Sequence, residues 1–241
     1  MNKIYKIFFY LQVLFLPFMV NSQSALPGWW QIINTEIVFN NKWSIVADVQ
    51  LRSQKIINEL NFYQFGMSIN YKPLKDVSIL GGLNQLNTYS NGGNFKKPVL
   101  SKEFRLWEQV AFVNNIGRIR IEHRYRVEHR WRSNGYRNRF RIRLNTIIPI
   151  NKSTVEKGTL YATLYDEVFM SDKLPNYELN RLQGGLGYQF SPSIKLVIAW
   201  IRQFSFSVNN NTPSNHLLQT TLSLRLKPHL SHHPHHNIIS N

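Results

Sequence analysis

The chain has 241 residues, of which 43% are hydrophobic and 13% aromatic, and its 29 Lys and Arg against 13 Asp and Glu give a formal net charge of +16. This hydrophobic content excludes an intrinsically disordered chain, which is poor in apolar residues. The lack of cysteine excludes a disulfide-linked scaffold, a thiolate metal site and a cysteine nucleophile.

The first residues have the pattern of an export signal. Lys3 and Lys6 precede a mostly apolar stretch at 7–20, and small or polar residues follow at 21–25. This pattern predicts a cleaved secretory signal peptide over 1–22, because the apolar run is too short for a comfortable membrane-spanning helix. A retained N-terminal anchor is the alternative. Export also argues against intracellular nucleic-acid binding, which so basic a chain would otherwise suggest.

The rest of the chain alternates apolar and polar residues. In the clearest run, 42–52, the odd-numbered residues from Trp43 to Leu51 are apolar and most even-numbered residues are polar. A period of two predicts a β-strand with one apolar and one polar face. Similar runs predict eleven candidate strands, the first weaker than the others, near residues 30–39, 42–52, 59–71, 77–88, 103–113, 118–131, 137–148, 158–169, 179–190, 194–206 and 215–226.

The length of these runs indicates a membrane barrel. Most have about 10–14 residues, longer than the strands of soluble sheets and sufficient to cross a bilayer at a tilt. Aromatic residues at strand ends, such as Trp43, Tyr71, Trp131 and Tyr188, suit membrane interfaces. We therefore expect an all-β fold, a closed antiparallel transmembrane β-barrel of 10–12 strands with an up-and-down meander. A secreted β-sandwich or lipocalin-like barrel is the alternative.

The domain boundaries follow from this layout. After the signal peptide at 1–22, the segment 23–41 forms either the first strand or a lumenal or rim segment, 42–226 forms the barrel, and 227–241 forms a disordered tail. Because single-chain bacterial barrels have even strand numbers, we expect ten or twelve strands. With 30–39 outside the wall, ten strands remain, and they begin and end on the periplasmic side.

Several blocks resemble a known family. The runs at 103–109, 118–125 and 137–143, followed by 165–169, 180–182 and 185–188, look like an uncharacterised outer-membrane β-barrel family, a domain of unknown function that is widespread in Bacteroidetes. The resemblance covers about 29–226. It implies an outer-membrane barrel and, because the family has no established activity, it implies no catalytic residue.

Arginines crowd the segment 118–143, which contains ten of the chain's fifteen arginines and only two acidic residues. They alternate with apolar residues and with His123 and His129, and arginine facing mid-bilayer lipid costs about 2–4 kcal/mol. We therefore expect the charged set to face the lumen. It comprises Arg118, Arg120, Glu122, Arg124, Arg126, Glu128, Arg130, Arg137, Arg139, Arg141 and Arg143, with Glu103, Arg105, Glu167 and Arg181 on other strands.

Two interpretations of this charged cluster remain open. Antiparallel pairing of 118–131 with 137–148, through a loop at 132–136, would place nine arginines side by side. With four nearby glutamates the local charge would be about +5, which favours anions. Alternatively, the same residues form an internal ion-pair network that fills a narrow barrel.

The last thirteen residues form a histidine-rich tract. Short tracts of this kind can bind Zn, Cu or Ni. A disordered tail without a metal-binding role is the alternative that we adopt, so we expect neither a metal nor a cofactor. The histidines concerned are His229, His232, His233, His235 and His236.

No enzymatic motif stands out. The sequence has no nucleophile elbow, metalloprotease motif or catalytic carboxylate pair. Tyr165, Asp166 and Glu167 could be considered as a site, but an interfacial tyrosine and a lumenal acid explain them. We predict a non-enzymatic outer-membrane protein, a monomer whose partners are the lipid bilayer and anionic solutes or lipopolysaccharide, with no nucleic acid. An outer-membrane lipid-modifying enzyme of phospholipase or deacylase type is the alternative function.

Overall fold

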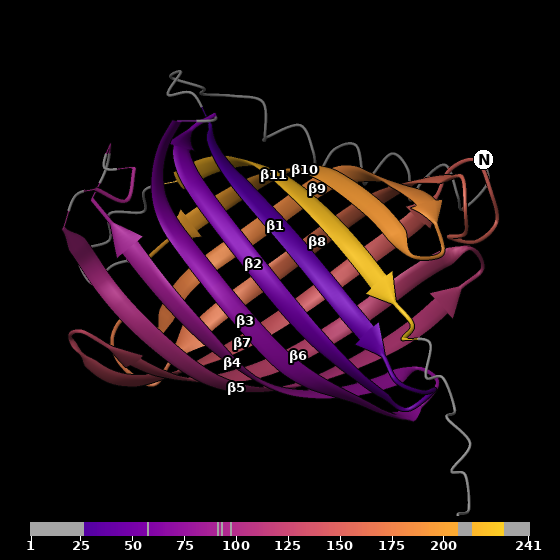
Figure 1. Ribbon diagram of the computed structural model, residues 1–241, viewed down its shortest axis with the longest axis horizontal. Coiled ribbons are helices and arrows are strands. Elements are labelled where there is room, and N and C mark those ends of the chain that lie inside the picture. Colours follow the sequence, from indigo (N-terminus) through magenta and orange to yellow (C-terminus); the bar gives the residue numbers. More distant parts are fainter. Residues whose placement is uncertain are drawn as a thin grey trace, which may run out of the picture.

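Eleven β-strands follow one another along the chain and close into one barrel (Figure 1). The computed structural model describes residues 27–56, 58–90, 92, 94–96, 98–206 and 214–228. Within these ranges no helix has the length and apolarity of a membrane span. The strands are β1 (Gly28–Val38), β2 (Trp43–Lys55), β3 (Asn58–Leu74), β4 (Val77–Tyr89), β5 (Val99–Ile116), β6 (Ile119–Arg132), β7 (Gly135–Pro149), β8 (Thr159–Ser171), β9 (Tyr177–Ser191), β10 (Ile194–Ser205) and β11 (Ser214–Leu226).

The barrel is a meander with one parallel seam. Each strand pairs antiparallel with the next, from β1–β2 to β10–β11, which confirms the expected fold class. β1 and β11 close the barrel in parallel, from Gly28 opposite Leu217 to Ile37 opposite Leu226, and their arrowheads point the same way in Figure 1. A meander with an odd number of strands must close in this way, because its first and last strands run in the same direction.

The seam corrects one expectation and decides between two alternatives. The strand number is eleven rather than even. Of the two alternatives for the segment 23–41, β1 forms the first strand of the wall rather than a lumenal or rim segment. The ten-strand arrangement with both ends on one side is therefore wrong. β1 pairs as regularly with β2 as with β11, over ten residues on each side, because a strand left outside a closing barrel would leave two unpaired edges.

The connections between the strands define two ends of the barrel. We call the end with the connections after β1, β3, β5, β7 and β9 the turn end, and the opposite end the loop end. The connection after β6 is shorter than expected, because β6 extends to Arg132 and β7 starts at Gly135, which leaves Ser133 and Asn134 as the turn. Gly135 has φ +111°, a conformation that glycine adopts without steric cost.

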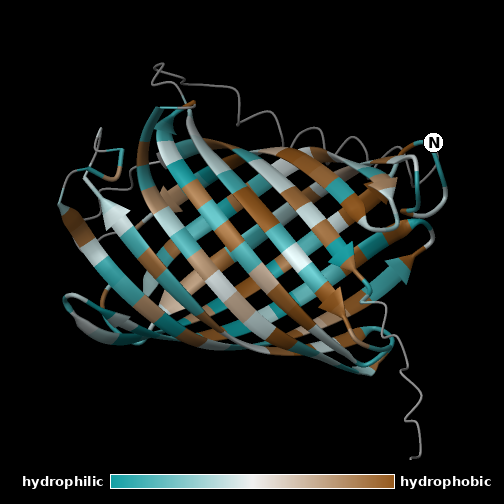
Figure 2. Ribbon diagram, in the orientation of Figure 1, coloured by the Kyte–Doolittle hydropathy of each residue, from teal (hydrophilic) through white to brown (hydrophobic). Residues whose placement is uncertain are grey.

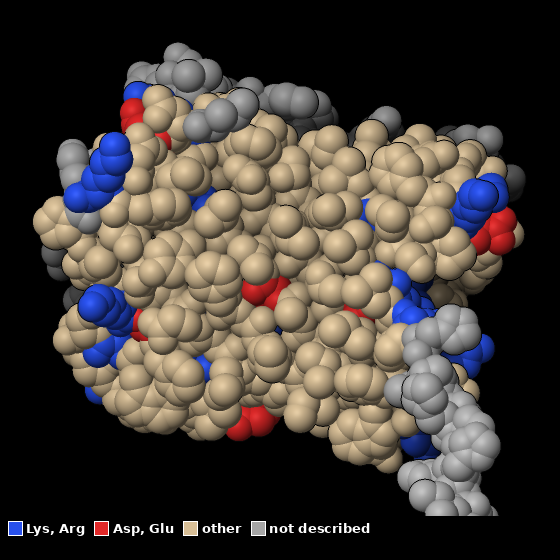
Figure 3. Space-filling view, viewed as in Figure 1, with Lys and Arg blue, Asp and Glu red and all other residues tan. Residues whose placement is uncertain are grey.

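The two faces of the wall have opposite character. On β3, Phe65, Met67 and Ile69 are exposed on the outside, whereas Gln64 and Ser68 are buried inside. Figure 2 shows this alternation of apolar and polar residues along the strands. In Figure 3, lysines and arginines gather toward the two ends of the visible face, and the band between them is mostly uncharged. This is the surface expected of a barrel that spans a bilayer.

Aromatic side chains lie near both ends of the outer face. At the turn end, the rings of Trp43 and Tyr71 lie 4.6 Å apart. At the loop end, the ring of Trp131 lies 5.8 Å from that of Phe104 and 5.2 Å from that of Tyr136. These pairs have the positions of the aromatic girdles that flank the apolar band of membrane barrels.

Candidate functional site: the lumenal arginine network

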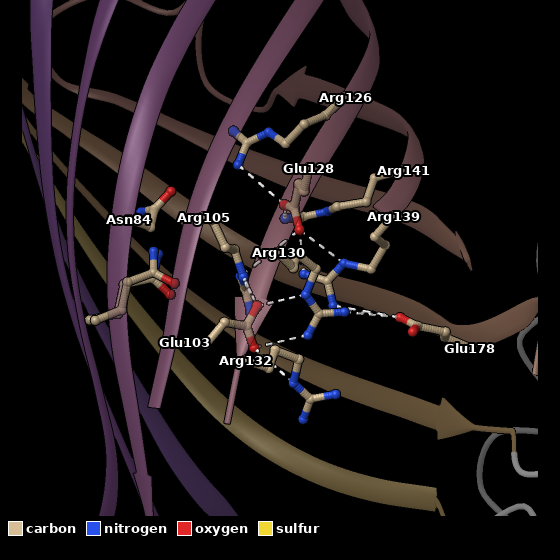
Figure 4. A network of polar contacts seen from close by, with 12 residues as sticks. Asn84, Glu103, Arg105, Arg126, Glu128, Arg130, Arg132, Arg139, Arg141 and Glu178 are labelled. Carbon is tan, nitrogen blue, oxygen red and sulfur yellow. Dashed lines mark hydrogen bonds and ion pairs between the residues drawn. The ribbon is translucent and has the colours of Figure 1, made fainter. Parts of the chain in front are cut away.

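The inward faces of β5 to β9 bring together a dense set of charged side chains, part of which Figure 4 shows. Successive residues of a strand point to opposite faces, so the alternating arginines of β6 and β7 all enter the lumen. We call this set the arginine network. It comprises Arg105, Arg124, Arg126, Arg130, Arg132, Arg137, Arg139, Arg141, Arg143 and Arg181, with Glu103, Glu122, Glu128, Glu167 and Glu178.

Glu128 of β6 is one of the two carboxylates at the centre of the network and is only 1% exposed. Arg139 donates to its Oε2 from Nε at 2.9 Å and from Nη2 at 2.5 Å. Arg141 donates from Nη1 to Oε1 at 2.5 Å, and Arg126 Nη1 lies 3.8 Å from the same oxygen. Several guanidinium groups therefore share one buried carboxylate (Figure 4).

Glu167 of β8 is the second buried centre and is also 1% exposed. It accepts hydrogen bonds from Arg124 and Arg141, the latter from Nε at 3.1 Å and Nη2 at 2.8 Å. Arg181 Nη1 lies 3.4 Å from its other oxygen. Because Arg141 also bonds Glu128, the two centres form one continuous network.

Glu103 of β5 organises the loop end of the network. Arg130 donates to both of its oxygens, from Nε at 2.6 Å and from Nη2 at 3.0 Å. Arg105 donates to the same carboxylate, and Arg132 Nε lies 3.4 Å from Oε2. Glu103 is thus shared by three arginines (Figure 4).

Aromatic and amide groups hold other arginines of the lumen. Arg126 donates to Gln109 from Nε at 2.9 Å and Nη2 at 2.7 Å, and its guanidinium carbon lies 3.9 Å from the centre of the Trp107 ring. The guanidinium carbon of Arg141 lies 4.6 Å from the centre of the Phe169 ring. Contacts of this kind stabilise a cation without neutralising its charge.

The middle of the lumen is filled by side chains. Glu128, Glu167 and Phe169 are 1% exposed and Ile201 is fully buried, although all four side chains point inward. A residue that lined a water-filled pore would be accessible to water. Cavities instead lie at the two ends, one of about 280 Å³ at the loop end and one of about 120 Å³ at the turn end.

The wall formed by β2, β3 and β4 is mainly neutral. Its carboxylate Asp48 accepts hydrogen bonds from Gln50 at 2.9 Å, Gln64 at 2.8 Å and Asn84 at 3.4 Å. The arginine network together with Arg52 and Asp48 contains eleven arginines and six carboxylates, so 11 − 6 leaves five positive charges in excess in this set.

Three residues lie elsewhere than expected. Arg118 lies in the turn between β5 and β6, because β6 starts only at Ile119, so it is outside the lumenal wall. Arg120 belongs to β6 and has the inward parity of Glu122 and Arg124, and it is exposed at the rim of the turn end. Arg132 belongs to β6 and to the network rather than to a loop. Tyr165 is a buried lumenal residue rather than an interfacial one.

Tyr165, Asp166 and Glu167 do not form one site. Tyr165 and Glu167 are buried in the lumen, whereas Asp166 points outward and accepts a hydrogen bond from Asn180 at 2.6 Å. Adjacent residues of a strand necessarily lie on opposite faces.

Sequence reasoning missed Glu178, Asp48 and Arg52. Glu178 accepts a hydrogen bond from Arg137 at 2.6 Å and one from Arg130 at 3.3 Å. The register shifts between Phe169 and Met170, where β8 pairs with the start of β9, and this irregularity hides the lumenal position of Glu178. Asp48 and Arg52 lie on the polar face of the clearest predicted strand, so the alternation that found the other residues could have found them.

A polar row lies on the outer face near the loop end. His129 Nε2 lies 3.5 Å from Glu108 Oε2, and His129 Nδ1 lies 2.9 Å from the Tyr136 hydroxyl and 2.8 Å from Asn138 Oδ1. Asn138 donates in turn to Asp172 at 2.8 Å. No group of three or more potential ligands among the described residues could hold a metal ion. The histidines of the C-terminal tract lie outside the described residues.

Comparison with known proteins places the barrel in a family. The family model described as "Protein of unknown function (DUF2490)" matches residues 28–214. The chain belongs to this family. The matched region runs from the first residue of β1 to the first residue of β11, so it covers ten of the eleven strands of the barrel, β1 to β10. No curated protein matches the chain.

A solved structure has a similar fold. It is described as the NanC porin, and it matches with a TM-score of 0.52 and 13% sequence identity over 83% of this chain and 97% of that one. At this identity the likeness concerns the fold alone. The protein is therefore a porin-like β-barrel of the DUF2490 family.

Proposed function

We propose that the protein is an exported outer-membrane barrel whose lumen attracts and binds anionic solutes. The apolar outer band, the aromatic girdles and the porin-like fold support a position in a membrane. The basic, apolar and polar segments of residues 1–25 support export. The lumen then provides the polar interior of a membrane barrel.

The observation that carries the proposal is the excess of arginine over carboxylate inside the barrel. Buried charges without partners are costly, and low-dielectric walls focus the field of the remaining charges. Solute anions reduce this cost when they enter. Rings of arginine are a known means of favouring anions over cations in membrane pores.

The filled middle of the lumen determines the mode of transport. Glu128 and Glu167 occupy guanidinium groups that an anion would have to contact on its way through. Passage therefore requires the arginines to exchange a protein carboxylate for the solute. We expect a small, anion-selective conductance rather than the large one of a wide porin.

Reversal potentials across a salt gradient in planar bilayers test the proposal. We expect anion selectivity for the wild-type protein, and loss or inversion of it in Arg139→Glu/Arg141→Glu. Arg118→Glu makes the same kind of charge change outside the lumen and should leave selectivity nearly unchanged. Cation selectivity of the wild type would refute the proposal. Absence of conductance, together with strong destabilisation by Glu128→Gln, would indicate a purely structural network.

The surrounding membrane supplies further partners under this proposal. The outer face contacts lipid, and the phosphates of lipopolysaccharide are candidate anions at the loop end. A monomer suffices, because the lumen and its charges are complete within one chain.

A lipid-modifying enzyme is the second candidate, and one observation favours it. His129 lies between the carboxylate of Glu108 and the hydroxyl of Tyr136 on the outer face, where lipid is accessible. Phospholipase and deacylase assays in detergent micelles test it, with His129→Asn as the variant and His123→Asn, on the same face of β6, as the control. Turnover lost only in His129→Asn would establish this alternative.

A further inference from the structure

The cavity at the loop end has an uncommon charge balance. It is enclosed by β2 to β6 and has a volume of about 280 Å³. Four arginines line it, Arg52, Arg105, Arg130 and Arg132, with Glu103 as the one carboxylate of its lining. Its lining thus carries an excess of three positive charges.

Arg52 is the group that the network leaves without a carboxylate. Its guanidinium carbon lies 3.8 Å from the centre of the Trp30 ring and 4.4 Å from that of Phe62. Its Nε is buried without a hydrogen-bond partner, and within the described part of the chain Arg52 forms no ion pair. Stacking against aromatic rings orients the planar guanidinium without neutralising its charge.

Glu103 does not supply the missing partner. Arg130 bonds both of its oxygens, and Arg105 and Arg132 approach one each. Its acceptor positions are therefore occupied by three cations. A buried guanidinium without a counter-charge is costly, and an anion in the cavity beside Arg52 would supply one.

The remaining lining indicates what kind of anion fits. Asn61, Thr88 and Ser101 offer amide and hydroxyl groups, and Phe62 and Leu86 offer an apolar surface. The amide and hydroxyl groups can bond the hydroxyl groups of a solute, and the apolar surface can pack against its carbon skeleton. The volume accommodates a small organic molecule rather than a polymer.

We propose that this cavity is a binding site for a small hydroxylated organic anion, whose carboxylate or phosphate group is held by Arg52. The proposal rests on the anion preference proposed above and adds a location and a ligand class to it. Arginine is suited to both kinds of oxyanion, because its fork of N–H donors matches two oxygens at once. Bound there, the solute would occupy the loop-end entrance to the filled part of the lumen.

Isothermal titration of the purified full-length protein in detergent tests the site. The probes are glucuronate as the carboxylate, glucose 6-phosphate as the phosphate, and glucose as the uncharged control. We expect saturable binding of one molecule of either anion and none of glucose. Arg52→Gln should weaken this binding by about tenfold or more, because charged hydrogen bonds are lost.

Control variants separate binding from folding. Arg225→Gln removes an arginine from the cavity at the turn end and should leave binding unchanged. Arg52→Lys keeps the charge without the planar fork and should also weaken binding. Arg132→Gln provides a second test in the same cavity if Arg52→Gln lowers the yield of folded protein, which circular dichroism and heat-modifiable migration would report.

The outcomes distinguish this site from the general proposal. Equal affinity of wild type and Arg52→Gln for both anions would overturn the site. If the wild-type protein binds neither anion but is anion-selective in bilayers, the binding site is refuted and the proposed function stands. Loss of affinity for one anion only in Arg52→Gln would support the site and identify the oxyanion that it takes.

Discussion

Arg141 and Glu167 are joined by two hydrogen bonds across neighbouring strands, from Nε at 3.1 Å and from Nη2 at 2.8 Å to the same carboxylate oxygen. The residue directly opposite Glu167 on β7 is Arg143 rather than Arg141. Arg141 therefore reaches Glu167 diagonally, and the same side chain bonds Glu128 of β6. One arginine thus connects three strands inside the lumen.

Removal of the charge of Glu167 should destabilise the barrel strongly. Glu167→Gln leaves Arg124, Arg141 and Arg181 without their shared carboxylate, and breaking a buried pair costs about 3–5 kcal/mol. Asp166→Asn, the neighbouring residue on the outer face, should have a much smaller effect. Equilibrium unfolding in detergent with urea measures both. Similar stability of the two variants would contradict the inward orientation of Glu167.

Removal of the charge of Glu122, near the turn end, should reduce the stability of the barrel less. Glu122 and Arg143 lie 3.3 Å apart, and each side chain is more than one-fifth exposed, so water compensates part of the lost interaction. Glu122→Gln should therefore destabilise the barrel less than Glu128→Gln does. The same unfolding experiment ranks the two, and the reverse order would show that burial does not determine their contributions.

The two faces of β7 should respond oppositely to charge. Leu144 is exposed on the outer face, and an arginine at mid-depth in lipid costs about 2–4 kcal/mol, so Leu144→Arg should impair membrane insertion. Val49→Arg on β2 should behave in the same way. Arg143→Leu, on the inward face, should insert almost normally. Folding into lipid vesicles, followed by heat-modifiable migration, provides the measurement.

Gly187 should not tolerate even a methyl group. A Cβ there would lie 2.2–2.5 Å from ring and hydroxyl atoms of Tyr161, so Gly187→Ala should destabilise the barrel by about 1–3 kcal/mol. Gly81→Ala is the control, because a Cβ there meets nothing within 4 Å. A shift in the urea midpoint for Gly187→Ala alone is the expected result, and equal midpoints would refute the close contact.

Cysteine cross-linking tests the parallel seam. The natural chain has no cysteine, so a pair placed at Ile33 and Leu222, which face each other in the register of β1 and β11, gives an unambiguous signal. Ile33→Cys/Leu222→Cys should form a disulfide under mild oxidation, because neighbouring strands lie within the required distance. Ile33→Cys/Leu218→Cys, displaced by four residues, should not. The opposite pattern would refute the register.

The sequence was sufficient for the wall of the barrel and for most of the lumen. The two-residue period identified all eleven strands and placed Arg139, Arg141 and Glu128 inside, since facing is fixed wherever alternation is regular. The two-residue period gave wrong assignments at strand boundaries, where the alternation of apolar and polar residues ends. Arg118 is the first residue of the predicted strand 118–131, and Arg132 lies one residue beyond its other end. A boundary shift of one residue at each end decided whether these two arginines belong to the lumen.

Closure could not be predicted in the same way. The pairing of β1 with β11 joins residues nearly at opposite ends of the barrel sequence, and no local pattern encodes which edge meets which. The irregular register at the start of β9 likewise conceals Glu178. Both features depend on tertiary pairing, whereas periodicity reports only which face of a strand is apolar.

The odd strand number also gives the barrel a polarity that an even meander lacks. β1 begins at the loop end, and β11 finishes at the turn end (Figure 1). A peptide tag joined immediately before Gly28 would therefore emerge on one side of a bilayer, and a tag joined after Leu226 on the other. One tag could then bind a reagent on one side of the membrane while a reporter on the other tag is detected on the opposite side. A single molecule of this barrel would thus present two labels across an intact envelope.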